Sequence, residues 1–417
     1  MGILPKSKAA AKERADRVSR DKVLPDLHLK MSTTPRRTVQ IALPSTGEEE
    51  WLAVREPLKS GWLTQGPQVA AFENAFAAPH GVRHALATTS CTTALHLVLA
   101  ALGVGPGDEV IVPSFTWVAT ANAVLYCGAV PVLCDVDAVT HNIDPESVLS
   151  KLTSRTKAVV AVHLFGLCAD MDALRAGLPT HVHIVEDAAC AAGAVYKGRP
   201  AGSLGVAGCF SFHPRKSITT GEGGMLTTND DALAARAQVL RNHGASVSEE
   251  QRHYGAQPYL LPDFDELGFN YRMTDVQAAI GLVQLGKLDR FIDERNLRAR
   301  YYREELADVS WLRHPVAPND GRHAWQAYVA TVDSAKSRLP RNEIMAHLHK
   351  MGVATRPGTH AIHRLGFYRK TFGFADDDFP RSRDAERDTM AIPLHNRMNE
   401  DDYEYVVECI RQIDRGN

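Results

Sequence analysis

The feature that most constrains the fold is an apolar run, Val206 to Phe212, which is followed closely by a lysine and then by a cluster of glycines. The segment from Ser211 to Gly224 reads Ser-Phe-His-Pro-Arg-Lys-Ser-Ile-Thr-Thr-Gly-Glu-Gly-Gly, with the lysine at position 216. A lysine that forms an imine must be desolvated or lie beside other cations, because a protonated lysine is a poor nucleophile. The end of a buried strand, after His213 and Arg215, predicts both conditions for Lys216.

A second apolar run, from Val182 to Glu186, ends in the carboxylate of Asp187. Alone, each residue is more often a surface lysine or an aspartate that caps a helix. Together they match what pyridoxal phosphate requires. An aspartate keeps the pyridine nitrogen protonated so that the ring accepts electrons, and a lysine holds the cofactor as an imine. Asp187 and Lys216 therefore predict an enzyme that uses this cofactor.

Short apolar runs alternate with helical patterns along most of the chain. The apolar runs lie at 109–113, 130–136, 158–163, 182–186, 208–212 and 225–228, and helical spacing occurs at 48–60, 69–76, 94–102, 119–127, 171–178 and 231–242. This alternation predicts an α/β fold with a mostly parallel sheet that helices cover on both faces. Ligands of such folds bind at the carboxyl ends of strands, where Asp187 and Lys216 fall.

Three parts are expected along the chain. Residues 1–36 are rich in Lys, Arg, Ala and Asp and short of large apolar residues, which indicates a flexible N-terminal extension without the apolar core of a signal peptide. A large cofactor-binding domain is expected at 37–296. A smaller C-terminal α+β domain is expected at 297–417, since a long helix near 274–300 precedes a strand at 325–332 and helices at 341–350 and 401–413.

Composition narrows the class of protein. The chain is 44% hydrophobic and 23% charged, with a formal net charge of -2, which favours neither a nucleic acid nor a membrane surface as partner. No apolar run approaches the roughly 20 residues that cross a bilayer. The seven cysteines form no CxxC pair and no metal-type spacing, so we expect reduced thiols in a cytoplasmic protein and no metal site.

The chain resembles the DegT/DnrJ/EryC1/StrS family of sugar aminotransferases over a stretch from about Ile41 to about Ile413. Six motifs carry the resemblance, in the family's order: Gly61-Trp-Leu-Thr-Gln-Gly66, Thr89-Ser-Cys-Thr-Thr-Ala-Leu95, Pro113-Ser-Phe-Thr-Trp117, Glu186-Asp187-Ala-Ala, the segment around Lys216, and Gly268-Phe-Asn270-Tyr-Arg-Met-Thr-Asp275. The resemblance implies a fold type I transferase that depends on pyridoxal phosphate, in which Lys216 and Asp187 are catalytic.

The segment 89–94 predicts a phosphate site, because it opens a helix directly after a strand and backbone N–H groups at a helix N-terminus bind phosphate. The alternative is an ordinary helix cap. By resemblance, Cys91 and Thr92 contact the cofactor phosphate and Ser211 adds a hydroxyl. The resemblance also places Trp117 on the face of the cofactor ring, although a tryptophan could equally fill the core.

Asn270 shows from the sequence only a turn before a helix that Thr274 caps. In the family, the matching asparagine reaches the cofactor phosphate of the neighbouring subunit, which implies a homodimer with shared active sites. Cys190 departs from the family, where Gln, His or Glu usually orients the phenolic oxygen of the cofactor. Cysteine is a weak hydrogen-bond partner, so a water or another side chain takes over this contact, or the enzyme tolerates its loss.

Seven residues are candidates for the substrate cleft. His163 lies at the carboxyl end of a strand, although a lone histidine is more often structural. The other candidates rest on position or resemblance, and they are Trp62, Thr64, Gln65, His323, Arg356 and His360. For Arg356 a solvated loop position is the alternative.

The resemblance predicts an aminotransferase that moves an amino group from L-glutamate to a keto-sugar through the Lys216 imine. The loop from Arg356 to His363 is similar to that of perosamine-type synthases, which favours a nucleotide-linked 4-keto-6-deoxyhexose as substrate. Two alternatives stay open at this point. One is an aminotransferase for a 3-keto sugar or a cyclitol ketone in antibiotic biosynthesis, and the other is a non-catalytic regulator that binds pyridoxal phosphate.

Overall fold

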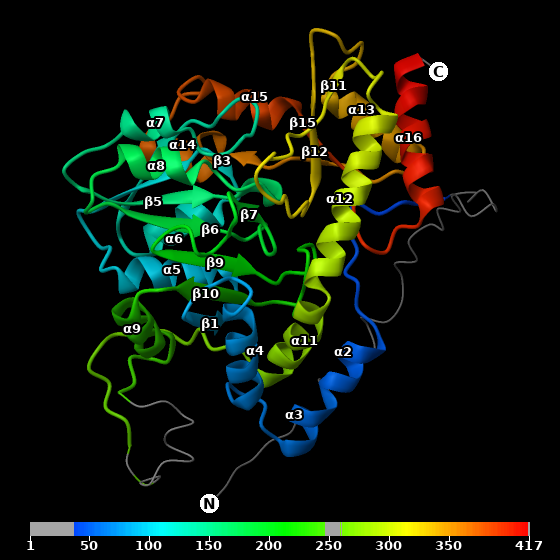
Figure 1. Ribbon diagram of the computed structural model, residues 1–417. Coiled ribbons are helices and arrows are strands. Elements are labelled where there is room, and N and C mark those ends of the chain that lie inside the picture. The colour runs from blue at the N-terminus through cyan, green and yellow to red at the C-terminus, as the bar shows by residue number, and fades with distance from the viewer. Residues whose placement is uncertain (1–36, 247–258, 260, 416–417) are drawn as a thin grey trace, which may run out of the picture. The chain divides into compact units, whose positions relative to one another are not determined.

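A computed structural model describes residues 37–246, 259 and 261–415 (Figure 1). The chain divides into the units Met1–Arg37 and Thr38–Asn417, and the elements given below belong to the second unit. The extension expected at residues 1–36 lies outside the described residues.

The centre of this unit is a seven-stranded sheet with the strand order β1-β10-β9-β6-β5-β2-β4. The five strands from β9 to β4 run parallel, and β10 is antiparallel to both of its neighbours, so the predicted mostly parallel sheet is confirmed. The strands are β1 (His84–Thr88), β2 (Glu109–Pro113), β4 (Val130–Cys134), β5 (Thr156–Val162), β6 (His183–Asp187), β9 (Ala207–Ser211) and β10 (Gly224–Thr228).

Helices cover both faces of this sheet because successive side chains of a strand point to opposite faces. Val110 and Val112 pack with the first group of helices, whereas Ile111 between them packs on the other side. The first group is α5 (Cys91–Ala101), α6 (Ala119–Tyr126) and α9 (Asp231–Arg241). The opposite face packs against α4 (Pro67–Ala77), α7 (Pro145–Leu149), α8 (Met171–Gly177), α11 (Asp275–Gly286) and the start of α12 (Leu288–Glu305).

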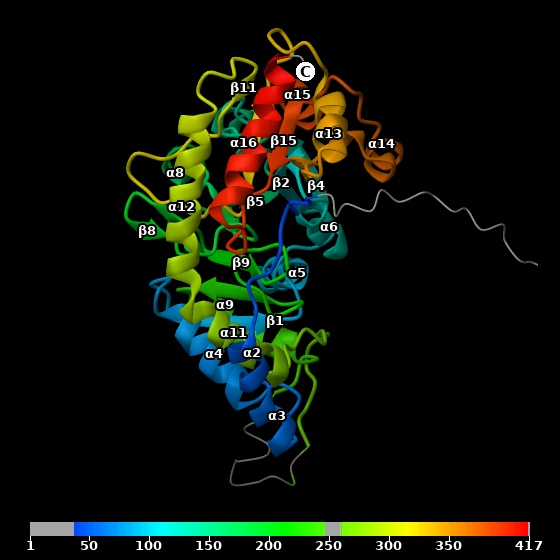
Figure 2. The same cartoon turned by 90° about the vertical axis from the view of Figure 1, so that its right-hand side faces the viewer.

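A second, four-stranded sheet has the order β11-β12-β15-β13. Its strands are β11 (Leu312–Arg313), β12 (Tyr328–Val332), β13 (Arg356–Pro357) and β15 (Thr389–Ile392), and it packs with α13 (Arg341–Lys350) and α16 (Glu400–Arg415). Helix α12 joins the two cores, since Phe291 packs near the large sheet and Tyr302 packs with the small one. Figure 2 shows α12 and α16 side by side. The boundary at 296/297 stays a prediction, and α12 runs through it.

The segment between β13 and β15 returns to the large sheet. It holds β14 (His360–Ala361), α14 (Gly366–Phe372) and α15 (Pro380–Asp388). Strand β14 pairs with β3 (Phe115–Thr116), and Tyr368 packs in the core beside α5 and α6. This return brings His360 beside the Pro113–Trp117 motif.

Three predicted elements differ from the structure. The helix expected at 48–60 is two helices, α2 (Glu48–Ala53) and α3 (Arg55–Ser60), because Pro57 has no N–H to donate to the carbonyl of Ala53. The helix expected at 274–300 is α11 and α12, which meet at Lys287. The strand expected from 325 begins at Tyr328, since Trp325 has a left-handed φ of 45° that no strand accommodates.

The remaining elements are short. They are β7 (Val195–Tyr196), β8 (Arg199–Pro200) and the 3₁₀ turns Leu164–Gly166 and Ile362–Arg364. Within the described ranges, no helix combines the length and the apolar character that a bilayer crossing needs.

Candidate active site

Lys216 lies in the loop after β9, and its Nζ donates a hydrogen bond to the Sγ of Cys190 at 3.2 Å. Burial acts to lower the pKa of Lys216, but Cys190, which accepts its hydrogen bond, and the carboxylate of Asp187 raise the pKa above its usual value. The expectation that neighbouring cations would depress this pKa is therefore wrong. Arg215 is exposed, and burial together with the charges of Arg215 and Lys216 lowers the pKa of His213, so the neighbouring cations are present but do not outweigh Cys190 and Asp187 at the lysine.

Asp187 ends β6 and is buried, with 5% of its surface exposed. Its Oδ2 accepts a hydrogen bond from Thr120 Oγ1 at 2.8 Å, and its Oδ1 accepts one from the backbone N–H of Ala189 at 3.2 Å. The Sγ of Cys91 lies 3.9 Å from the same Oδ1. Asp187 is thus held by donors and lies close enough to Lys216 to act on its charge.

The N-terminus of α5 forms the third part of the site. Ser90 and Thr93 cap the helix reciprocally, since each backbone N–H donates to the hydroxyl of the other residue. The backbone N–H groups of Cys91 and Thr92 lie in the first turn, where no helical carbonyl can accept from them. Burial, together with the charge of Asp187, raises the pKa of Cys91 well above its usual value, so the thiol stays neutral.

Gly224, at the start of β10, lies directly against this helix end. A Cβ at this position would be 2.4 Å from the carbonyl carbon of Ser90 and 2.6 Å from the backbone nitrogen of Cys91. Both atoms are backbone and cannot move aside cheaply. Only glycine therefore allows β10 and the start of α5 to come together beside the lysine loop.

Two further predicted residues flank this region. Ser211 ends β9 half-buried, and its Oγ accepts from the backbone N–H of His213 at 3.4 Å. Trp117 is 56% exposed, which excludes the alternative of a core filler, and its ring lies 5.7 Å from that of His360. Phe115, two residues earlier, is fully buried.

Asn270 is exposed, and its backbone bridges to Asn242. An exposed side chain is compatible with a contact to a second subunit, so the predicted role across a dimer interface stays a prediction. The Thr274 cap is confirmed, because its hydroxyl accepts from the N–H of Gln277.

The substrate candidates fall into two groups. His163 and His323 lie in the interior: His163 uses one ring nitrogen on Glu186 and the other on the N–H of Ala169, and His323 stacks on Trp325 at 3.8 Å. His163 therefore has no free nitrogen for a substrate, and neither histidine is among the proposed substrate contacts. The second group, Trp62, Thr64, Gln65, Arg356 and His360, lies partly or fully exposed.

Sequence reasoning missed two residues that shape the site. Thr120 donates a hydrogen bond to Asp187. In the sequence, the only indication of this role was a hydroxyl group in the first turn of the helix after Trp117. Glu186 is fully buried and accepts from three backbone N–H groups at 2.7 Å, those of Gly202, Leu204 and Gly205. With the bond from His163, this carboxylate fixes the end of β6 next to Asp187.

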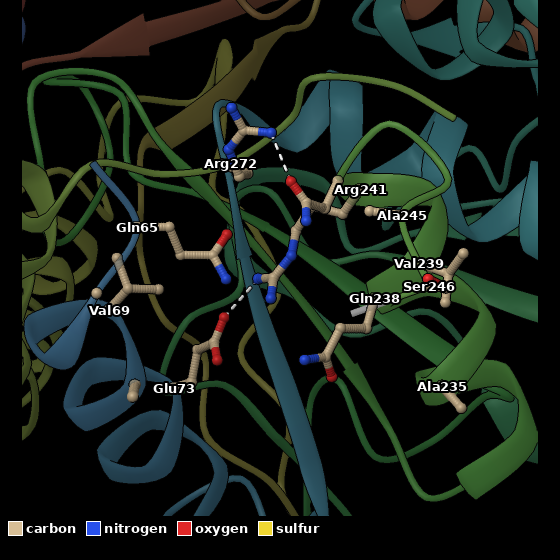
Figure 3. A pocket seen from close by; sticks show the side chains of 13 residues that line it. Gln65, Val69, Glu73, Ala235, Gln238, Val239, Arg241, Ala245, Ser246 and Arg272 are labelled. Carbon is tan, nitrogen blue, oxygen red and sulfur yellow. Dashed lines mark hydrogen bonds and ion pairs between the residues drawn. The ribbon is translucent and has the colours of Figure 1, made fainter. Parts of the chain in front are cut away.

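A cavity of about 290 Å³ lies between α4 and α9 (Figure 3). The ion pair of Glu73 and Arg241 crosses its floor, and these two side chains bond to the backbone N–H and C=O of Ala87. Strand β1 is the edge of the sheet, and the pair satisfies the backbone N–H and C=O of Ala87 on that edge. Arg272 Nη1 donates a hydrogen bond to Asn242 Oδ1, and both residues also line the cavity. The cavity lining includes Gln65, one of the substrate candidates, but neither Lys216 nor Asp187, so we assign the cavity to the scaffold.

The residues at the carboxyl ends of β6 and β9 fit pyridoxal phosphate. The start of α5 offers unpaired N–H donors for a phosphate, Asp187 offers a buried carboxylate for a protonated ring nitrogen, and Lys216 offers a reachable amine. Fold and site together define a fold type I enzyme that depends on pyridoxal phosphate.

Comparisons with known proteins agree with this class. The family model of the DegT/DnrJ/EryC1/StrS aminotransferase family matches residues 44–411. The chain is 42% identical to the spore coat polysaccharide biosynthesis protein SpsC of Bacillus subtilis over 377 residues, which cover 90% of this chain and 97% of that protein. It is 40% identical to the GDP-perosamine synthase of Caulobacter vibrioides over 386 residues, which cover 92% of this chain and 100% of that protein.

A solved structure supports the same conclusion. The PLP form of the putative sugar aminotransferase Spr1654 from Streptococcus pneumoniae has a TM-score of 0.83 and 27% identity, and the match covers 91% of this chain and 99% of that one. The chain therefore belongs to the DegT/DnrJ/EryC1/StrS aminotransferase family, as the sequence motifs predicted. It is a sugar aminotransferase, and its cofactor is pyridoxal phosphate.

Proposed function

We propose that this enzyme transfers an amino group from L-glutamate to a nucleotide-linked 4-keto-6-deoxyhexose and forms a 4-amino sugar. The observation that carries the chemistry is the placement of Asp187 at the end of β6 and of Lys216 in the loop after the adjacent strand β9, where the carboxylate acts on the charge of the lysine. The substrate class is supported by the 40% identity to a protein named GDP-perosamine synthase.

Pyridoxal phosphate, when bound, supplies an electron sink for the amino group transfer. Asp187 would hold the ring nitrogen through its carboxylate, and the first N–H groups of α5 with the Ser211 hydroxyl would hold the phosphate. Lys216 Nζ would carry the cofactor and would move the proton at the α-carbon of the amino donor. Trp117 covers one side of the site and shields it from water.

The substrate contacts in this proposal come from the exposed candidates. His360 lies beside Trp117 and would meet the sugar, and Arg356, four residues earlier, would meet the nucleotide. Trp62, Thr64 and Gln65 would approach the sugar from the N-terminal segment. The proposal also includes a homodimer in which Asn270 completes the phosphate site of the second subunit.

Activity on a panel of substrates tests this function. Purified protein is incubated with L-glutamate and with 4-keto-6-deoxyhexoses linked to GDP, dTDP or UDP, and formation of 2-oxoglutarate and of the amino sugar is measured. We expect one nucleotide series to react and the Lys216→Ala variant to be inactive with every substrate. Turnover of a 3-keto sugar or a cyclitol ketone, with none of the 4-keto sugars, would favour the alternative substrate class.

A further inference from the structure

Two buried hydroxyl groups, from residues that flank Trp117 in the sequence, connect to Asp187 by hydrogen bonds. Thr120 Oγ1 is 2.8 Å from Asp187 Oδ2, and Thr116 Oγ1 is 3.2 Å from Thr120 Oγ1. Thr116 is 1% exposed and Thr120 is fully buried. Neither hydroxyl has access to water that could replace these bonds.

The direction of the two bonds follows from the chemistry of the groups. An ionised carboxylate can only accept, so Thr120 must use its single hydroxyl proton on Asp187. The Thr120 oxygen then has only acceptor capacity left, and Thr116 must be the donor of the second bond. The result is a one-way relay from Thr116 through Thr120 to the carboxylate.

The position of the relay ties it to the rest of the site. Thr116 belongs to β3 and lies opposite His360 in the pairing with β14. Thr120 lies in the first turn of α6, where its backbone N–H bonds to the carbonyl of Trp117. The same few residues therefore hold the exposed tryptophan and the buried carboxylate.

We propose that Thr116 and Thr120 are positioning residues that fix the orientation of Asp187 and stabilise its charge toward the cofactor ring. This inference rests on the proposed role of Asp187 and adds two residues that no motif assigned. A hydrogen bond to the charged form of a carboxylate favours that form, and a bond on Oδ2 limits rotation of the group. Without it, the buried carboxylate would lose its closest side-chain donor.

The test is cofactor binding by the full-length protein, measured by equilibrium dialysis against graded pyridoxal phosphate. Thr120→Val keeps the shape but removes the hydroxyl, and Thr120→Ser keeps the hydroxyl. We expect Thr120→Val to weaken binding by about 10-fold or more, which is the effect of losing a hydrogen bond to a charged group. The Kd of Thr120→Ser for pyridoxal phosphate should lie within about 2-fold of the wild-type Kd, which corresponds to about 0.4 kcal/mol of binding free energy.

A double-mutant cycle separates positioning from a general structural role. If Thr120 acts through Asp187, the Thr120→Val change should cause no further weakening in an Asp187→Asn background. Thr116→Val should weaken binding less than Thr120→Val, in the same direction, because it acts one bond further away. It also provides the test if Thr120→Val does not fold. The visible absorption of the bound cofactor, titrated with pH, should shift in Thr120→Val and return in Thr120→Ser.

Three results would overturn the inference. These are equal binding by Thr120→Val and wild type, equal impairment of Thr120→Ser and Thr120→Val, or an unchanged penalty in the Asp187→Asn background. None of these measurements involves a sugar, so failure of the proposed substrate class leaves them unaffected. Conversely, a normal relay with no activity on any keto-sugar would refute only the proposed function.

Discussion

Replacing Gly224 by alanine should damage both the fold and the cofactor site. The new Cβ would lie 2.4 to 2.6 Å from the carbonyl group of Ser90 and the backbone nitrogen of Cys91, well inside van der Waals contact. The atoms it meets belong to the backbone at the start of α5, so relief requires the helix or β10 to move. Forced overpacking of this kind costs about 1–3 kcal/mol, and a backbone clash belongs at the upper end.

The expected change in melting temperature follows from the size of the chain. For 417 residues the entropy of unfolding is about 0.9 kcal/mol per degree, so 3 kcal/mol corresponds to a fall of roughly 3 °C. Because the clash displaces the N–H groups that would bind phosphate, the variant should also gain less thermal stability from added pyridoxal phosphate than wild type does.

A matched control uses a glycine with free space around it. Gly286 lies at the end of α11 with nothing within 4 Å of an added Cβ, so Gly286→Ala should melt at or slightly above the wild-type temperature. Both variants are measured by differential scanning calorimetry with and without cofactor. If Gly224→Ala has the wild-type melting temperature, and if the cofactor raises that temperature as much as in wild type, the close approach of β10 to α5 is refuted.

Three other predictions concern pH, the carboxylate and the second subunit. Burial lowers the pKa of four histidines to about 4 or about 3, namely His80, His141, His323 and His395. Each histidine therefore gains a proton near pH 6.5 in the unfolded chain but not in the folded chain. The free energy of unfolding should fall by about 1.4 kcal/mol per pH unit for each histidine as the pH is lowered from roughly 6 to 4. Equal melting temperatures at pH 7 and pH 5 would contradict this. Asp187→Asn should retain the cofactor but lower the rate of amino transfer by orders of magnitude in stopped-flow absorbance, and a rate within about twofold of wild type, only about 0.4 kcal/mol of barrier, would reject its role. Mixing the Lys216→Ala and Asn270→Ala chains should restore activity if Asn270 is shared between subunits and is impaired alone, whereas a monomeric protein in light scattering would rule out sharing.

The strand ends that carry the chemistry could be predicted because they depend on local patterns. An apolar run that stops at a carboxylate or shortly before a lysine marks a strand end in a parallel sheet, and both Asp187 and Lys216 lie where this reasoning put them. Helix boundaries were less predictable. Periodicity continued across Pro57 and Lys287 and predicted single helices, although Pro57 itself was a signal in the sequence for the first break.

Contacts between distant segments could not be predicted from periodicity. His163 was expected in the cleft because it follows a strand, but its ring points to Glu186, whose other partners come from the loop at 202–205. Thr120 and Asp187 are 67 residues apart, and nothing in either local pattern indicates that they meet. The direction of the Lys216 pKa likewise depends on Cys190 and Asp187, which only the fold brings to the lysine.

Lys216 as the residue that holds the cofactor is central to every proposed role of the site. Borohydride reduction of the holoenzyme, followed by peptide mapping with mass spectrometry, identifies the lysine that carries pyridoxal phosphate. We predict the label on the peptide that contains Lys216, and no covalently held cofactor in the Lys216→Ala variant. Label on a different lysine, or full labelling of the alanine variant, would contradict the central claim.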